Sequence, residues 1–165
     1  MATQITPTTE LQTVNQMLSV IGEAPVNAIT GTVTTDVSVA KNILDETTMS
    51  VQSMGWNFNS HYAYVLTKDT DNKVPLRSNC VQADASAQYR DRNLVIRNGF
   101  LYDMDNHTDV FGTSTTLPTV DLVLVQQFEQ LPEYARQYIA AKSARRFASR
   151  YIGDKGLTEL AGNDE

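Results

Sequence analysis

One stretch decides the fold class: Leu94-Val95-Ile96-Arg97-Asn98-Gly99-Phe100-Leu101-Tyr102. Asn98-Gly99 lies between two apolar runs, and a two-residue hairpin turn needs positive φ at both of its central positions, which asparagine and glycine tolerate. The stretch therefore predicts an antiparallel β-hairpin with its turn at these two residues.

Further strands are predicted on either side of this hairpin. Residues 61–67 and 121–125 are rich in branched or aromatic side chains, which is typical of strands. Residues 74–77 could form a short strand at an edge, because proline at position 75 cannot donate to a ladder. Residues 104–118 are polar and predict a loop.

Two amphipathic helices are predicted before the strands. Thr6-Pro7 is typical of a helix start and Gly22 of a helix end, and Pro25 prevents continuation, so the first helix should cover residues 7–21. Asp36 can cap the second helix, which Gly55 should end. Its expected apolar face is Val37, Ala40, Leu44, Val51 and Met54, with Thr47 in the gap. We expect Trp56 and Phe58, just after the glycine, to fold back and be buried against the helices.

A third helix is predicted after the strands. Leu131-Pro132-Glu133 opens it and Gly153 should end it, leaving residues 156–165 as a polar tail. The order helix, helix, strands, helix predicts an α+β fold, a small bundle of amphipathic helices with an inserted antiparallel hairpin and sheet region. The expected division is a helical core of residues 1–60 plus 130–155 and a β-rich insertion of 61–129, within one structural unit.

Composition limits the function classes. Thirteen basic against nineteen acidic residues give a net charge of −6, which argues against general nucleic-acid binding. Cys80 is the only cysteine, which excludes an intrachain disulfide and suits cytoplasmic synthesis. The sequence lacks an apolar run of about 18 residues, so no membrane span is expected.

No catalytic, metal or cofactor site stands out. His61 and His107 have no cysteine or acid at a metal-site spacing, so structural or solvent-exposed roles are expected. Asp103, Asp105 and Asp109 invite comparison with a calcium loop, but the glycine and the final acid that such a loop requires are missing. The chain is therefore not expected to be an enzyme.

The last helix carries the most unusual feature, a set of basic residues in an acidic protein. Lys142, Arg146 and Arg150 recur every four residues and share one face, and Arg145 lies about 100° round the helix. The set is a solvated face, or it meets an acidic neighbour or lines a DNA channel. The candidate interface residues are Arg136, Lys142, Arg145, Arg146 and Arg150.

Three segments in register resemble tail tubular protein A, the head-to-tail adaptor of short-tailed phages. The resemblance spans roughly residues 11–153. The segments are Val14-Asn15-Gln16-Met17-Leu18 leading into Ile21-Gly22-Glu23-Ala24-Pro25-Val26, then Gln52-Ser53-Met54-Gly55-Trp56-Asn57-Phe58-Asn59, and Leu131-Pro132-Glu133 followed by Arg136, Tyr138-Ile139, Ala144-Arg145-Arg146-Phe147, Arg150 and Gly153. Gly22, Pro25, Gly55, Trp56 and Phe58 are expected to be packing and chain-reversal residues.

The resemblance implies a structural virion protein at the head–tail junction. It implies a twelve-subunit ring with the portal above, a nozzle of the tail tubular protein B type below, and DNA passing through the lumen without sequence-specific binding. Family members usually continue with more helical sequence beyond the final glycine, which this chain does not match. The alternatives are a virion-associated glycan hydrolase, which requires a pair of carboxylates about 5–9 Å apart in a cleft, and a regulatory binding module.

Overall fold

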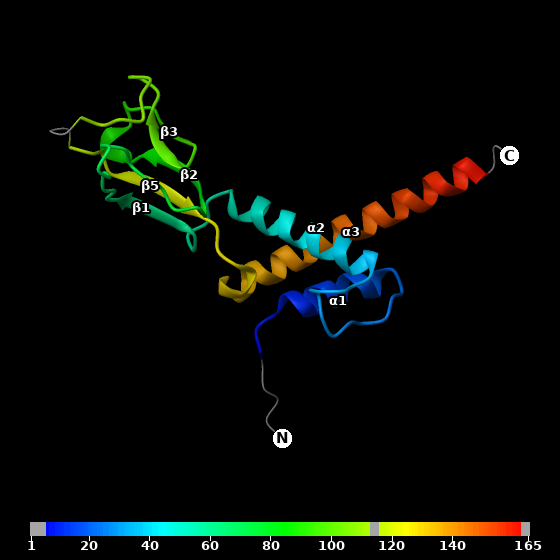
Figure 1. Cartoon of the computed structure of the whole chain (residues 1–165). Coiled ribbons are helices and arrows are strands. Elements are labelled where there is room, and N and C mark those ends of the chain that lie inside the picture. Colours follow the sequence, from blue (N-terminus) through cyan, green and yellow to red (C-terminus); the bar gives the residue numbers. More distant parts are fainter. Residues whose placement is uncertain (1–5, 113–115, 163–165) are drawn as a thin grey trace. The chain divides into compact units, whose positions relative to one another are not determined.

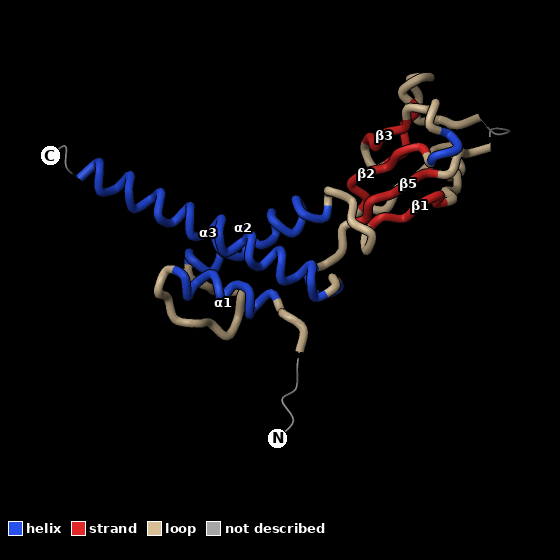
Figure 2. Tube along the Cα trace, turned by 180° about the vertical axis from the view of Figure 1, so that it is seen from behind, coloured by secondary structure: helices blue, strands red, loops and turns tan. Residues whose placement is uncertain are grey.

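The chain forms two compact units, one helical and one built of strands. The computed structural model describes residues 6–112 and 116–162, with side chains for 6–112 and 116–151. The helical unit comprises Met1–Val51 and Gln127–Glu165, and the β unit comprises Gln52–Gln126. Figures 1 and 2 show the helices and the antiparallel strands in separate parts of the chain. The predicted α+β fold class is confirmed.

Helix α1, Glu10–Val20, begins later than predicted. Thr9 is its N-cap: the Thr9 hydroxyl accepts from the backbone N–H of Gln12 at 3.2 Å, and the Gln12 side chain accepts from the N–H of Thr9 at 3.0 Å. The predicted start at Thr6-Pro7 is therefore wrong, because this reciprocal capping box satisfies two N–H groups and a proline at position 7 offers no equivalent.

The end of α1 is where the sequence predicts it. Gly22 has a left-handed backbone conformation with φ +80°, and the N–H of Glu23 donates to the carbonyl of Leu18 at 3.1 Å. This combination is a common way to end a helix. The chain after it is held by Asn15, whose side chain exchanges hydrogen bonds of 3.0 and 2.8 Å with the backbone of Val26. The reversal through Pro25 is thus fixed by a side chain on α1.

Helix α2, Thr35–Gln52, buries a face close to the predicted one. Its buried apolar residues are Val37, Ala40, Ile43, Leu44 and Val51, with Thr47 buried among them. Met54 follows the helix and is 62% exposed, so its predicted place on this face is wrong. Asp36 lies in the first helical turn rather than at the cap, because the helix already begins at Thr35.

Helix α3, Glu133–Gly162, opens as predicted but does not stop at Gly153. A glycine within a helix costs about 1 kcal/mol relative to alanine, which good helix formers around it can offset. The predicted end is therefore wrong, and residues 156–162 of the expected polar tail are helical, whereas 163–165 lie outside the described residues. The buried positions on α3 are Ala135, Ile139, Ala140, Ser143 and Phe147.

The β unit holds two antiparallel sheets. The strands are β1 (Ser60–Tyr64), β2 (Cys80–Ala85), β3 (Leu94–Arg97), β4 (Phe100–Asp103) and β5 (Val120–Leu124). β1-β5-β2 form one sheet and β3-β4 form the other. The Asn98-Gly99 hairpin is confirmed, with φ of +50° and +79° at the two turn positions. The short 3-10 helices Ala87–Tyr89 and Phe128–Gln130 complete the regular structure of the described residues.

Two features of the β unit differ from expectation. β2 occupies residues that carry no strand pattern, and residues 74–77 form only an isolated bridge between Pro75 and Phe100. Both sheets share one apolar core, made of Val74, Ala83, Leu94, Leu101, Phe111, Val120, Leu122 and Leu124. Alternate residues of β5 enter this core, so Asp121 and its neighbours on β2 lie on the other face of the sheet.

The segment after α2 buries amides rather than aromatics. The predicted burial of Trp56 is wrong, since it is 41% exposed, and Phe58 is half-buried. Gln52 and Asn59 are fully buried instead: the Asn59 side chain donates to the carbonyl of Gln52 at 2.8 Å and accepts from the N–H of Trp56 at 2.8 Å. Gly55 has φ +72°, and a Cβ there would lie 3.3 Å from Cγ2 of Val123, so the turn needs glycine.

Candidate interaction surface on α3

The three helices of the helical unit are linked pairwise by polar contacts. Lys41 on α2 forms ion pairs with Glu10 on α1 at 3.5 Å and with Asp45 one turn along α2. Two oxygens of Glu133 on α3 accept from the hydroxyl and the N–H of Thr8 at 2.6 and 2.9 Å, just before α1. The Glu133 contacts anchor the start of α3, and Ile139 and Phe147 further along it are buried, so the basic residues extend from a helix that is packed into the unit.

Arg136 is used inside the helical unit. Its side chain is only 11% exposed, and it donates to the carbonyl oxygens of Leu131 (2.8 Å), Thr8 (3.0 Å) and Glu129. The guanidinium also lies 3.6 Å from the carboxylate of Glu129. The planar guanidinium of Arg136 thus joins the start of α3 to the segment before α1. Because Arg136 is used for this internal contact, it is not part of the proposed interface.

Lys142 and Arg146 are partly engaged. The ammonium of Lys142 lies 5.9 Å from the ring centroid of Tyr138, one turn earlier on α3. Arg146 donates to the hydroxyl of Thr47 at 2.9 Å and to the carboxylate of Glu46 at 3.1 Å, both on α2. The Arg146 and Glu46 side chains are 45% and 61% exposed, so this ion pair contributes at most about 1 kcal/mol.

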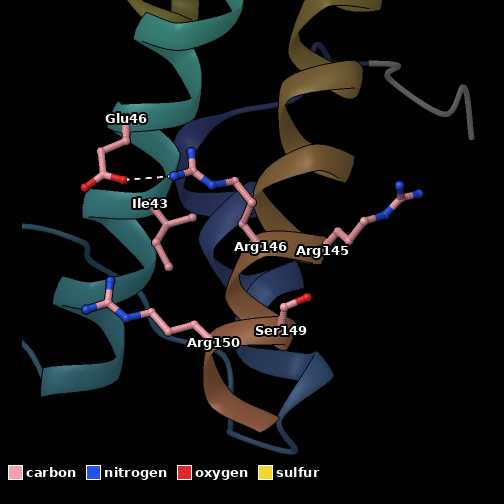
Figure 3. Close-up of a pocket in the computed structure, with 6 residues that line it drawn as sticks. All are labelled: Ile43, Glu46, Arg145, Arg146, Ser149 and Arg150. Carbon is pink, nitrogen blue, oxygen red and sulfur yellow. Dashed lines mark hydrogen bonds and ion pairs between the residues drawn. The ribbon is translucent and has the colours of Figure 1, made fainter. Parts of the chain in front are cut away.

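Of the five predicted interface residues on α3, Arg145 and Arg150 are the two that remain available for a partner. Both are exposed, and neither forms an ion pair with any residue whose side chain the structure describes. Figure 3 shows Arg145 pointing away from α2 and Arg150 reaching toward it. With Arg146 they border an open depression of about 380 Å³, which is lined by Ile43, Glu46, Arg145, Arg146, Ser149 and Arg150. The structure therefore brings three of the five predicted residues together around one hollow and separates Arg136 and Lys142 from it.

Asp103 and Asp109, two of the acidic residues compared with a calcium loop, have hydrogen-bond or ion-pair partners within the β unit. Asp103 accepts from the N–H groups of Asp105 and Asn106 at 2.9 and 3.0 Å and from the Asn106 side chain at 2.9 Å. Burial acts to raise the pKa of Asp103, but these hydrogen bonds outweigh it and the pKa lies below its usual value. Asp109 pairs instead with Lys73 at 2.8 Å. Among the side chains that the structure describes, in residues 6–112 and 116–151, no three potential ligands gather into a metal site.

His61 and His107 are both exposed, and they lie in β1 and in the loop after β4. None of the helices in the described part of the chain is both long and apolar enough to cross a bilayer.

Comparison with known families decides the class of protein. Residues 11–165 match the family described as Tail tubular protein, a range that includes α1 apart from its first residue, α2, the β unit and the whole described length of α3. The chain belongs to the tail tubular protein family. A search of curated proteins found no match. Family membership makes the protein a structural component of a bacteriophage tail. The three segments that resemble the family contain the hydrogen bonds between Asn15 and Val26, the one between Gln52 and Asn59, and the first turn of α3.

Proposed function

We propose that this tail tubular protein is a head-to-tail adaptor of the A type. It assembles into a ring, of twelve subunits by resemblance, at the junction between head and tail, with the portal above and the nozzle below. DNA passes through the lumen of the ring during ejection, and the protein does not bind it sequence-specifically. The proposal rests on the family match and on one observation: Arg145 and Arg150 project from α3 with no acidic partner among the described side chains, in a chain of net charge −6.

Exposed cations on an acidic protein favour contact with an acidic partner. Complementary charges steer encounter and fix the orientation of subunits, even where each pair adds little affinity. A ring of identical subunits uses two different faces per subunit, so a basic face requires an acidic face on the next copy or on the portal. The hollow beside Ser149 offers room for a partner side chain between Arg146 and Arg150.

The glycan hydrolase alternative has no comparable support. Asp103 is the only buried acidic side chain among those described, and all its hydrogen-bonding atoms are engaged by Asp105 and Asn106 within its own loop. A general acid instead needs a carboxyl whose pKa is raised and which faces a substrate cleft.

The decisive experiment mixes the purified full chain with the portal ring of the same phage and measures mass by mass photometry. The adaptor proposal expects many copies on each portal, close to one per portal subunit. A chain that leaves the portal mass unchanged at micromolar concentration, whether or not it self-associates, would refute the head-to-tail adaptor role.

A further inference from the structure

The outward face of the β1-β5-β2 sheet carries a charge arrangement that the monomer does not explain. Asp84 on β2 and Asp121 on β5 lie directly opposite each other in the antiparallel register. Side chains at such positions have Cβ atoms about 4.5–5.5 Å apart, and like charges there destabilise the sheet. No basic residue among the described side chains forms an ion pair with either aspartate.

Each of these carboxylates keeps one oxygen available. One oxygen of Asp121 accepts from the N–H of Ala63 at 2.8 Å, and one oxygen of Asp84 accepts from the side chain of Gln82 at 2.6 Å. Within the described part of the chain, no hydrogen bond uses the second oxygen of either aspartate. The pair therefore presents two negatively charged acceptors on the same face of the sheet.

A groove of about 250 Å³ runs over this pair. Its walls include two strongly exposed side chains, Tyr62 (69% exposed) and Met54 (62% exposed). The groove is also lined by Val123, by the two aspartates and by Gly55. Small-molecule pockets usually measure about 300–1,000 Å³, so the groove is better matched to a single long side chain of a partner.

The chemistry of the groove fits an arginine. A guanidinium offers several donors in a plane, is always charged, and stacks on aromatic rings more readily than an ammonium does. In the groove, such a group would pair with the free oxygens of Asp84 and Asp121, while its stem and plane pack against Met54 and Tyr62. An arriving cation would also remove the repulsion between the two aspartates.

We propose that this groove, formed by Met54, Tyr62, Asp84 and Asp121, receives Arg145 or Arg150 from α3 of a second copy of the chain. The occupant is chosen by charge complementarity: these arginines lack acidic partners among the described side chains, and the aspartates lack basic ones. The inference rests on the proposed ring and deepens it, because it assigns the two unlike faces that a closed ring of identical subunits requires.

The test uses two full-length variants, Arg145→Glu with Arg150→Glu, and Asp84→Lys with Asp121→Lys. Each variant alone should assemble on the portal ring about tenfold more weakly or worse, since each meets like charge at its subunit contact. Mixed in equal amounts they should assemble again, because every contact then joins opposite charges. The matched control, Asp71→Lys with Asp91→Lys, changes two exposed acids elsewhere in the β unit and should assemble as wild type does.

The result that overturns the inference is normal assembly by Asp84→Lys with Asp121→Lys, or failure of the mixture while both variants remain folded. If the wild-type chain loads normally onto the portal in the same experiment, the adaptor proposal stands even when the proposal about the groove fails.

A second measurement separates an effect on assembly from an effect on folding. Asp84→Asn with Asp121→Asn should raise the melting temperature of the free chain and weaken assembly, whereas a lower melting temperature would show that the pair is structural and would also overturn the inference.

Discussion

Gln52 and Gln126 hold each other through two hydrogen bonds of 2.8 Å, although they are 74 positions apart in the sequence. The Gln52 amide donates to the carbonyl of Gln126 and accepts from its N–H, as a neighbouring strand would. These are the first and last residues of the β unit, so one side chain joins its two ends.

Replacing Gln52 with leucine should therefore destabilise the β unit by about 2 kcal/mol or more, because the N–H and carbonyl of Gln126 lose their partners beside a fully buried side chain. Trp56 is the only tryptophan and lies in the β unit, so its fluorescence during urea denaturation reports this unit. Gln16→Leu, at an exposed position on α1, serves as the control and should change little. Equal stability of Gln52→Leu and wild type would show that the Gln52–Gln126 hydrogen bonds do not stabilise the β unit.

Gly22 and Gly55 allow backbone strain to be separated from packing. Both have positive φ, so alanine at either position costs about 1–2 kcal/mol of backbone strain. A Cβ at Gly22 meets nothing within 4 Å, whereas one at Gly55 lies 3.3 Å from Val123 and 3.5 Å from Ser60. Thermal unfolding should show Gly55→Ala to be the more destabilising of the two, and the reverse order would contradict the crowding at Gly55.

Arg136 should matter for stability rather than for assembly. Arg136→Ala leaves the carbonyl groups of Leu131 and Thr8 without this donor, which should cost about 1.5–3 kcal/mol. Arg136→Lys should recover only part of the loss, because an ammonium cannot reproduce the planar fork. Far-UV circular dichroism during urea denaturation measures the effect, and Arg145→Ala on the exposed side of α3 should leave stability within about 0.5 kcal/mol of wild type.

Asp103 should make the β unit sensitive to acid. Its folded-state pKa is lowered, so the ionised form stabilises the fold above the unfolded-state value of about 3.9, and this contribution is lost as pH falls through the lower folded-state value. Asp103→Asn should therefore be less stable at neutral pH, by about 1–3 kcal/mol, and the difference from wild type should shrink below about pH 4. Parallel urea titrations from pH 7 to about pH 3 measure it. A difference that is the same at every pH would contradict the role given to the charge.

Charge reversal on α3 should separate folding from assembly. Arg145→Glu with Arg150→Glu should melt as wild type does, because neither residue has an ion pair among the described side chains, yet should load onto the portal ring about tenfold more weakly or worse. Adding Arg146→Glu should also lower the melting temperature, because the new carboxylate would face Glu46 and lose the bond to Thr47. Normal loading by the triple variant would exclude Arg145, Arg146 and Arg150 as interface residues.

The sequence predicted best those features that local chemistry controls. Asn98-Gly99 favours one turn type, Gly22 can adopt a left-handed φ, and Pro132-Glu133 suits the first turn of a helix, so all three could be placed without knowing the rest of the chain. Helix α1 starts later than Thr6-Pro7 predicts, because Thr9 and Gln12 form a reciprocal capping box that satisfies two backbone N–H groups.

What the sequence did not predict depends on distant partners. Gln52 is buried because Gln126 completes its hydrogen bonds, and β2 is a strand because β5 pairs with it. The same limit applies to the basic residues of α3. Helical spacing placed Arg146 and Arg150 on one face, but only the contacts with Thr8 and Glu46 show which cations are used internally and which remain exposed.

The division of the chain into a continuous β unit and a split helical unit has a consequence for biosynthesis. Residues 52–126 leave the ribosome in one run, so the β unit can be complete before any of α3 has been made. The apolar faces of α1 and α2, by contrast, emerge first and have no α3 to cover them until the last part of the chain is translated. Helices α1 and α2 are therefore translated before α3 but are among the last elements to complete their native contacts, and until then apolar residues such as Val14, Met17 and Leu44 are open to aggregation.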